Sequence, residues 1–113
     1  MESKIIYVAK VINCFLKERI SYDYDGVLTK KKVQEEVRKL VESGKYDVYI
    51  ISARDSKDGM ISMAMNLGIR LQNVYATGSN EDKIKKVKSL VIKRHYDNNI
   101  NVVNKLPYVG KLV

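Results

Sequence analysis

The stretch ISYDYDGVLTKKK, residues 20–32, decides the fold class that we expect for this chain. A β-branched and aromatic run over residues 19–23 predicts a short strand, and two aspartates, Asp23 and Asp25, mark its end before a glycine. Apolar side chains at helical spacing follow over residues 31–43 and predict an amphipathic helix. A strand that passes through a short turn into a helix is the first half of a βαβ unit.

The rest of the chain repeats this alternation of strand and helix. The segment YDVYIIS, residues 46–52, is a nearly continuous apolar run, which is typical of a strand buried on both faces of a parallel sheet. Further strands are expected at 73–77 and 92–97, and further helices at 57–67, 79–90 and 100–106. Because parallel strands need crossover connections, this order predicts an α/β domain of three α/β/α layers, Rossmann-like, with a mostly parallel central sheet.

The two ends of the chain lie outside this repeating core, which we place at residues 19–106 of a single domain, 1–113. Residues 1–18 have apolar positions at helical spacing and predict an N-terminal helical extension, with a short strand over residues 5–8 as the alternative. Residues 107–113 form a C-terminal tail that either adds an edge strand or trails from the core.

The composition indicates a soluble protein of a reducing compartment. Apolar residues make up 45% and charged residues 30% of the 113 residues, an ordinary globular balance. The single cysteine, Cys14, has no partner for an internal disulfide, so we expect a cytoplasmic protein. Lysines interrupt the apolar stretches near the N-terminus, which argues against a signal peptide, a membrane span or a membrane partner.

The charge of the chain is strongly basic. Twenty-one Lys and Arg against thirteen Asp and Glu give a formal charge of +8. Such a surface attracts anions, so phosphate esters and nucleic acid are the expected partners. The alternative, to which we give equal weight, is a lysine-rich surface that does no more than keep a small domain in solution.

Polar side chains end the predicted strands, at Asp23, Ser52, Thr77 and Asp97. In open α/β sheets ligands bind beyond the carboxyl ends of the strands, so these residues should surround the site. Asp23 and Asp25 occupy alternate positions, so their carboxylates point in different directions and can have different roles. A Mg²⁺ ion bound nearby would reduce the repulsion between them, and Asp97 would supply a third oxygen ligand. The Ser52 hydroxyl and the Lys83 charge suit a phosphoryl group.

The segments that contain Asp23 and Ser52 resemble the first two sequence motifs of the haloacid dehalogenase (HAD) superfamily of phosphatases. The first motif of that family is an apolar strand followed by Asp-x-Asp-Gly-(Thr/Val), which ISYDYDGVL matches at Asp23 and Asp25. The second motif is an apolar strand that ends in Ser or Thr, which DVYIIS matches at Ser52.

The third and fourth motifs follow in the order that the family requires. The third is a lysine near the start of a helix, for which we choose Lys83 in GSNEDK over Lys85 and Lys86. The fourth is an acidic cluster after a sheet strand, which HYDNN represents at Asp97. Many members carry a second acid there, and Asn98 in its place predicts a lowered affinity for the metal.

The resemblance implies a role for each residue. Asp23 would be the nucleophile that forms an aspartyl-phosphate, and Asp25 would be the general acid and base. Ser52 and Lys83 would hold the phosphoryl oxygens. Mg²⁺ would be bound by Asp23, by Asp25 through its backbone carbonyl, and by Asp97. Secondary candidates at the site are Asn98, Gly26 and Ala53.

The spacing of the motifs leaves no room for a cap domain, either after Gly26 or between Ser52 and Lys83. The resemblance therefore implies an open site and a Mg²⁺-dependent phosphohydrolase that acts on a phosphomonoester, such as a nucleotide, a nucleic-acid end or a phosphoprotein. The alternative is a basic module with this fold, weak or inactive as a catalyst, that binds nucleic acid or a protein.

His95 and three tyrosines flank the expected site. His95 should share a strand face with Asp97, but a lone histidine is more often a packed or surface residue than a functional one. Tyr22, Tyr24 and Tyr96 have the chemistry to stack on a base, although aromatic residues on strands usually pack against neighbours.

Overall fold

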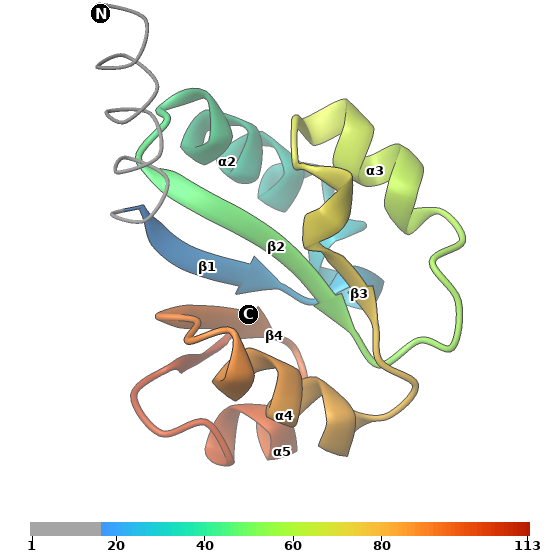
Figure 1. Ribbon diagram of the computed structural model, residues 1–113, viewed down its shortest axis with the longest axis vertical. Helices are drawn as coiled ribbons and strands as arrows, with labels where there is room; N and C mark the ends of the chain where they lie inside the picture. The colour runs from blue at the N-terminus through green and yellow to red at the C-terminus, as the bar shows by residue number, and fades with distance from the viewer. Residues whose placement is uncertain (1–16) are drawn as a thin grey trace, which may run out of the picture.

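A sheet of five parallel strands forms the centre of the protein in the computed structural model, which describes residues 17–113 (Figure 1). Its strands are β1 (Glu18–Tyr22), β2 (Tyr46–Ser52), β3 (Val74–Ala76), β4 (Arg94–Asp97) and β5 (Gly110–Leu112), in the order β3-β2-β1-β4-β5. The predicted α/β fold is therefore confirmed, and all of these strands are parallel. The N-terminal helical extension lies outside the described residues, apart from residues 17 and 18.

Helices cover both faces of the sheet and make the three layers (Figure 1). The first layer holds α2 (Lys31–Glu42) and α3 (Met60–Leu67), and the opposite layer holds α4 (Asn80–Ser89) and α5 (Ile100–Asn104). Two short turns, η1 (Tyr24–Leu28) and η2 (Leu71–Asn73), precede α2 and β3. Within the described residues no further domain is inserted between these elements, as the motif spacing predicts.

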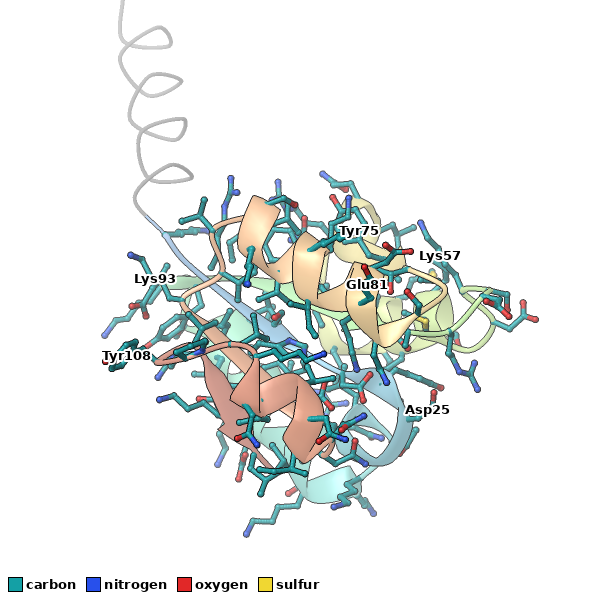
Figure 2. The ribbon with its side chains drawn as sticks, turned by 90° about the horizontal axis from the view of Figure 1, so that it is seen from below. Asp25, Lys57, Tyr75, Glu81, Lys93 and Tyr108 are labelled. Carbon is teal, nitrogen blue, oxygen red and sulfur yellow. The ribbon has the colours of Figure 1, made fainter. Side chains whose placement is uncertain are left out.

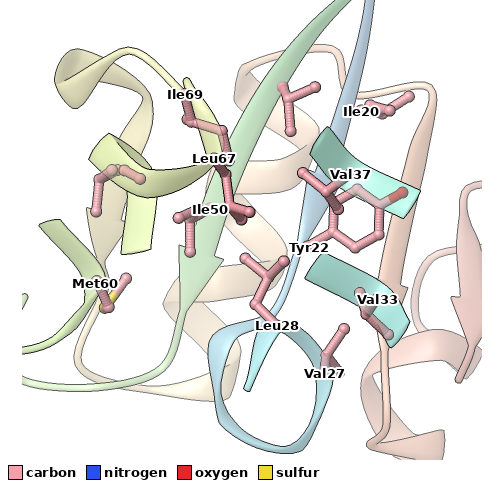
Figure 3. Close-up of a cluster of buried hydrophobic side chains, with 13 residues drawn as sticks. Ile20, Tyr22, Val27, Leu28, Val33, Val37, Ile50, Met60, Leu67 and Ile69 are labelled. Atoms are coloured by element: carbon pink, nitrogen blue, oxygen red, sulfur yellow. The ribbon is translucent and has the colours of Figure 1, made fainter. Parts of the chain in front are cut away.

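The layer of α2 and α3 contains the larger apolar core (Figure 3). Alternate residues of β1, Ile20 and Tyr22, face this layer, where Val37 of α2 and Met60 of α3 are fully buried. Each such side chain stabilises the fold by about 1.5–3 kcal/mol relative to exposure. The helix predicted over 57–67 begins at Met60, because Gly59 before it has φ +77°.

The second core lies under α4 and α5. Tyr49 and Ile51 of β2 face this layer, with Val87 of α4 and Val102 of α5. Strand β2 thus has buried side chains on both faces, as its continuous apolar run predicts. No helix within residues 17–113 is long and apolar enough to cross a membrane.

The strand order places a topological switch point between β1 and β4. The chain moves from β1 outward to β2 and β3, and then crosses to β4 on the other side of β1. The carboxyl ends of β1 and β4 therefore diverge into loops that leave a crevice, the usual ligand position of such sheets. The last residues, 110–112, form the edge strand β5, so the first of the two alternatives for the tail is confirmed.

Candidate active site

A polar pocket of about 380 Å³ lies at this crevice, beyond the carboxyl ends of β1, β2 and β4. Six of the predicted site residues line it: Asp23, Asp25, Ser52, Ala53, Lys83 and Asn98. In Figure 2, Asp25 lies at the same end of the molecule as Glu81 in the first turn of α4, whereas Lys93, which precedes β4, lies at the opposite end. Asp23 and Asn98, 75 positions apart in the sequence, thus meet at one sheet edge.

Asp23 directly follows β1 and is only 6% exposed. Its backbone N–H donates to the Tyr96 carbonyl at 2.9 Å, which extends the ladder to β4. The carboxylate Oδ1 accepts from the Tyr24 N–H at 2.9 Å and lies 3.5 Å from Lys83 Nζ. Within residues 17–113 no hydrogen bond or ion pair involves the other oxygen, Oδ2. Asp23 therefore has one oxygen, Oδ1, that the protein holds in place and another, Oδ2, that a ligand can contact.

Opposing influences act on the ionisation of Asp23. Burial raises the pKa of this carboxyl above its usual value, and Asp97 adds to the rise. The Lys83 ammonium and the Tyr24 N–H oppose it. Lys83 therefore does two things for Asp23: it favours the ionised form and it fixes the direction of one oxygen.

Asp25 lies in the turn η1, and its side chain is 59% exposed. Arg54 Nε donates to Asp25 Oδ2 at 2.9 Å. The turn depends on Gly26, which has φ +72°. This backbone angle favours glycine, and a Cβ at this position would also collide with the Asn98 side-chain amide unless that side chain moved.

Ser52 ends β2 and is buried. Its Oγ accepts from the Arg54 N–H at 3.2 Å, and its carbonyl accepts from Thr77 after β3. The Ser52 hydroxyl proton remains available to donate, because the hydroxyl acts as an acceptor in that contact. Ser52 thus offers an oriented donor at the pocket wall.

Lys83 lies one turn into α4 and is 2% exposed. Ser79 caps the helix by accepting from the Asp82 N–H at 3.0 Å, as the SNED pattern predicts. The other two candidate lysines lie elsewhere: Lys85 pairs with Glu81 on the exposed face, and Lys86 lies over the Tyr75 ring. Of the three, the structure brings Lys83 to the pocket.

Asp97 ends β4 beneath the pocket rather than on its wall, with no exposed surface. Oδ2 lies 2.7 Å from Lys83 Nζ and 2.9 Å from His95 Nε2, and Oδ1 accepts from the Asn99 N–H at 2.9 Å. Burial raises the pKa of Asp97, but the hydrogen bonds from His95, Lys83 and Asn99 outweigh it and hold the pKa at about 2. In this arrangement Asp97 is the counter-ion of Lys83, and both of its oxygens are occupied.

The burial of Asp97 and its contacts with Lys83 and His95 change the set of residues that could bind a magnesium ion. Within residues 17–113 no group of three or more His, Cys, Asp or Glu side chains is arranged to hold a metal. The pocket wall nevertheless presents oxygen donors of Asp23, Asp25 and Asn98. Mg²⁺ is usually bound through one or two carboxylates together with waters and substrate phosphate. This donor set fits such an ion without Asp97 as a direct ligand.

Ser21, His95 and Asp97 form a connected buried set. Ser21 Oγ lies 2.7 Å from His95 Nδ1, and His95 Nε2 contacts Asp97 as described. The residue types match a Ser-His-Asp triad, but all three side chains have no exposed surface. No substrate reaches this serine, so the set is not a nucleophilic centre. His95 is a packed residue, as a lone histidine usually is.

Residues that the sequence did not single out also line the pocket: Arg54, Asn80 and Asn99. Arg54 and Asn99 lie two residues after the ends of β2 and β4, and Asn80 directly follows the N-cap of α4. Position after a strand end is the signal that could have found Arg54 and Asn99.

The three tyrosines near the site have different neighbours. Tyr22 and Tyr96 stack on each other with ring centroids 4.7 Å apart, so they are packing residues, while Tyr24 lies under the Arg54 guanidinium.

Comparison of the sequence with protein-family models and with curated proteins gives no match. A function for this protein therefore has to be inferred from the arrangement of the pocket residues on the fold.

Proposed function

We propose that this protein is a HAD-like phosphohydrolase that cleaves phosphomonoesters through an aspartyl-phosphate on Asp23. The observation that carries the proposal is the meeting of Asp23, Asp25, Ser52 and Lys83 in one pocket at the switch point of the sheet. These side chains supply a nucleophile, an acid, a hydroxyl donor and a positive charge, which is the set that phosphoryl transfer needs.

In the first step the free oxygen of Asp23, Oδ2, attacks phosphorus in line with the leaving oxygen. The new Asp23 O–P bond forms as the ester P–O bond breaks, and the Asp25 carboxyl gives its proton to the leaving oxygen. Oδ1 stays on Lys83 and the Tyr24 N–H, which keeps the other oxygen directed at the pocket. Ser52 and Lys83 bind the equatorial phosphoryl oxygens.

In the second step water attacks the phosphorus of the aspartyl-phosphate. Asp25, now ionised, takes the proton of that water, and the bond between phosphorus and the Asp23 oxygen breaks to release inorganic phosphate. Arg54 holds Asp25 at 2.9 Å and so fixes the acid and base group that both steps use. Each step therefore depends on a residue that the pocket already orients.

The cation that the family uses has candidate ligands in this pocket. Asp23, the backbone carbonyl of Asp25 and the Asn98 amide oxygen would hold Mg²⁺, and Asp97 would contribute indirectly as the counter-ion of Lys83. When bound, Mg²⁺ neutralises phosphoryl charge and eases the approach of an anionic nucleophile. A single neutral amide in place of a second acid predicts weak binding, so saturation should require millimolar Mg²⁺.

Hydrolysis of p-nitrophenyl phosphate tests the proposal. We expect turnover that needs Mg²⁺ and that falls to background in Asp23→Asn with the folded circular dichroism spectrum retained. The matched control is Glu42→Gln, an exposed carboxylate at the end of α2, which should keep full activity. Turnover that survives in Asp23→Asn would remove the proposed nucleophile and with it the mechanism.

A basic binding module is the second candidate, and the formal charge of +8 together with Asn98 at the fourth motif favours it. Such a module would bind nucleic acid with an affinity that falls steeply as salt rises, and it would show no turnover. Binding of a single-stranded oligonucleotide at 50 and 200 mM salt, measured beside the hydrolysis assay, separates the two functions.

A further inference from the structure

Ser21 and His95 are wholly buried, and within residues 17–113 the hydrogen bonds of their side chains reach the proposed site through Asp97. We propose that this pair consists of positioning residues, which hold the Asp97 carboxylate in one orientation. Lys83, the ionic partner of that carboxylate, is thereby kept at the pocket beside Asp23. The inference rests on the proposed function, because it assigns Ser21 and His95 a positioning role in the same site.

The sheet brings the pair together. Ser21 of β1 and His95 of β4 are direct partners in the parallel register, and their side chains meet at 2.7 Å. Side chains alternate between the faces of a strand, so Ser21 points away from the α2 and α3 core that its neighbours Ile20 and Tyr22 enter. The pair therefore lies on the same side of the sheet as α4, which carries Lys83.

For a neutral His95 ring, hydrogen-bond accounting fixes the direction of every bond in the set. An ionised carboxylate only accepts, so Asp97 Oδ2 requires a proton on His95 Nε2, at 2.9 Å, as well as one from Lys83, at 2.7 Å. In the neutral ring Nδ1 is then an acceptor, and the Ser21 hydroxyl donates to it. This tautomer follows from the network of bonds, and it leaves the ring a single orientation.

The need for such support follows from the chemistry of lysine. Its ammonium is a point charge on a flexible four-carbon stem, with no shape of its own to fix its place. Lys83 Nζ is 2.7 Å from Asp97 but 3.5 Å from Asp23, so the buried carboxylate is its closer anchor. Without the His95 bond the Asn99 N–H still holds Asp97 Oδ1, so Oδ2 can shift about that contact and carry the ammonium with it. A displacement of about 1 Å at a reacting group costs on the order of 100-fold in rate.

Four variants test the inference. His95→Leu removes both ring bonds, His95→Gln keeps an N–H for Asp97, and Ser21→Ala removes the hydroxyl that orients the ring. Leu106→Ala is the matched control, because Leu106 is buried in the same layer without a polar link to the site. We expect kcat to fall about 10- to 100-fold in His95→Leu with KM changed less than threefold, to fall less in Ser21→Ala, and to recover largely in His95→Gln. Leu106→Ala should lower the melting temperature and leave kcat unchanged.

A readout that does not need turnover is the nitrogen NMR signal of the Lys83 ammonium, which is observable when the group is held in hydrogen bonds away from water. We expect this signal in the wild type, in His95→Gln and in Leu106→Ala, and its broadening or loss in His95→Leu. An unchanged signal and an unchanged kcat in folded His95→Leu would overturn the inference. A wild type with the signal but without turnover would overturn the proposed function and leave the positioning of Lys83 established.

Discussion

The Nε atom of Arg54 lies 2.9 Å from Oδ2 of Asp25, and this ion pair links the turn after β1 to the loop after β2. The guanidinium also donates to the Asp58 carbonyl at 2.7 Å and lies over the Tyr24 ring. Arg54 is therefore held on three sides and presents a fixed surface to Asp25. In the proposed mechanism Asp25 acts as both acid and base, and this contact fixes the position of its exposed carboxylate.

Arg54→Lys should lower kcat while the protein stays folded. Lysine keeps the charge but cannot reproduce the planar fork that binds the carboxylate and the carbonyl together. We expect kcat for p-nitrophenyl phosphate to fall about 10-fold, and Arg54→Ala to lower it further. Because both partners are substantially exposed, the melting temperature should hardly change.

Lys85→Ala is the control for that experiment, since it removes another exposed ion pair, to Glu81, whose residues are not among those that line the pocket. It should leave both kcat and the melting temperature as they are in the wild type. If Arg54→Ala were as active as Lys85→Ala, Asp25 would not depend on Arg54 for its position.

Two glycines with the same backbone angle give a second, internally matched prediction. Gly26 has φ +72° and Gly44 has φ +70°, but a Cβ on Gly26 would collide with Asn98, whereas a Cβ on Gly44 meets nothing within 4 Å. Gly44→Ala should therefore cost only the left-handed strain of about 1–2 kcal/mol, with unchanged kcat. Gly26→Ala should cost more and should also lower kcat, because the Asn98 side chain, which lines the pocket, must move away from the new Cβ.

Urea unfolding and steady-state kinetics of both variants measure these effects side by side. Equal losses of stability and unaltered kinetics in the two variants would mean that the close contact between the turn and the loop after β4 does not shape the pocket.

The sequence predicted most of the fold because its signals are local. The continuous apolar run of YDVYIIS indicates a strand buried on both faces, and the SNED pattern indicates the start of α4, and both appear in the structure as expected. The helical spacing of apolar residues predicts a start at residue 57, three residues before Met60, because this spacing does not reveal the left-handed Gly59.

The site was predictable to the extent that strand ends meet at one sheet edge. That rule places Asp23, Ser52 and Asp97 near one another, and the pocket or its floor contains all three. It does not say which side chain lines the wall and which lies beneath. The burial of Asp97 depends on the register of β1 with β4 and on the reach of Lys83, and both are properties of tertiary packing.

The dependence of stability on pH provides a third prediction, which rests on Asp97. The pKa of this carboxyl is about 2 in the folded protein against an ordinary value of 3.8. A depressed pKa in the folded state means that the ionised form stabilises the fold, by about 2 kcal/mol here. This stability is fully present above about pH 4 and is lost as the pH falls through 2. Asp23 has the opposite effect on stability. Its pKa is raised on folding, so its ionised form destabilises the fold and its protonation at lower pH removes that cost.

Urea midpoints of the wild type, Asp97→Asn and Asp23→Asn between pH 2 and 6 separate these contributions. The advantage of the wild type over Asp97→Asn should shrink as the pH falls from 4 to 2, because the wild-type carboxyl becomes protonated and resembles the amide in charge. The stability of the wild type relative to Asp23→Asn should instead rise as the pH falls, because protonation removes the free-energy cost of a buried Asp23 carboxylate. The other carboxyl groups titrate in all three proteins and cancel in the differences. A wild-type advantage over Asp97→Asn that stays constant across this range would show that the contacts of Asp97 with Lys83 and His95 do not favour its ionised form.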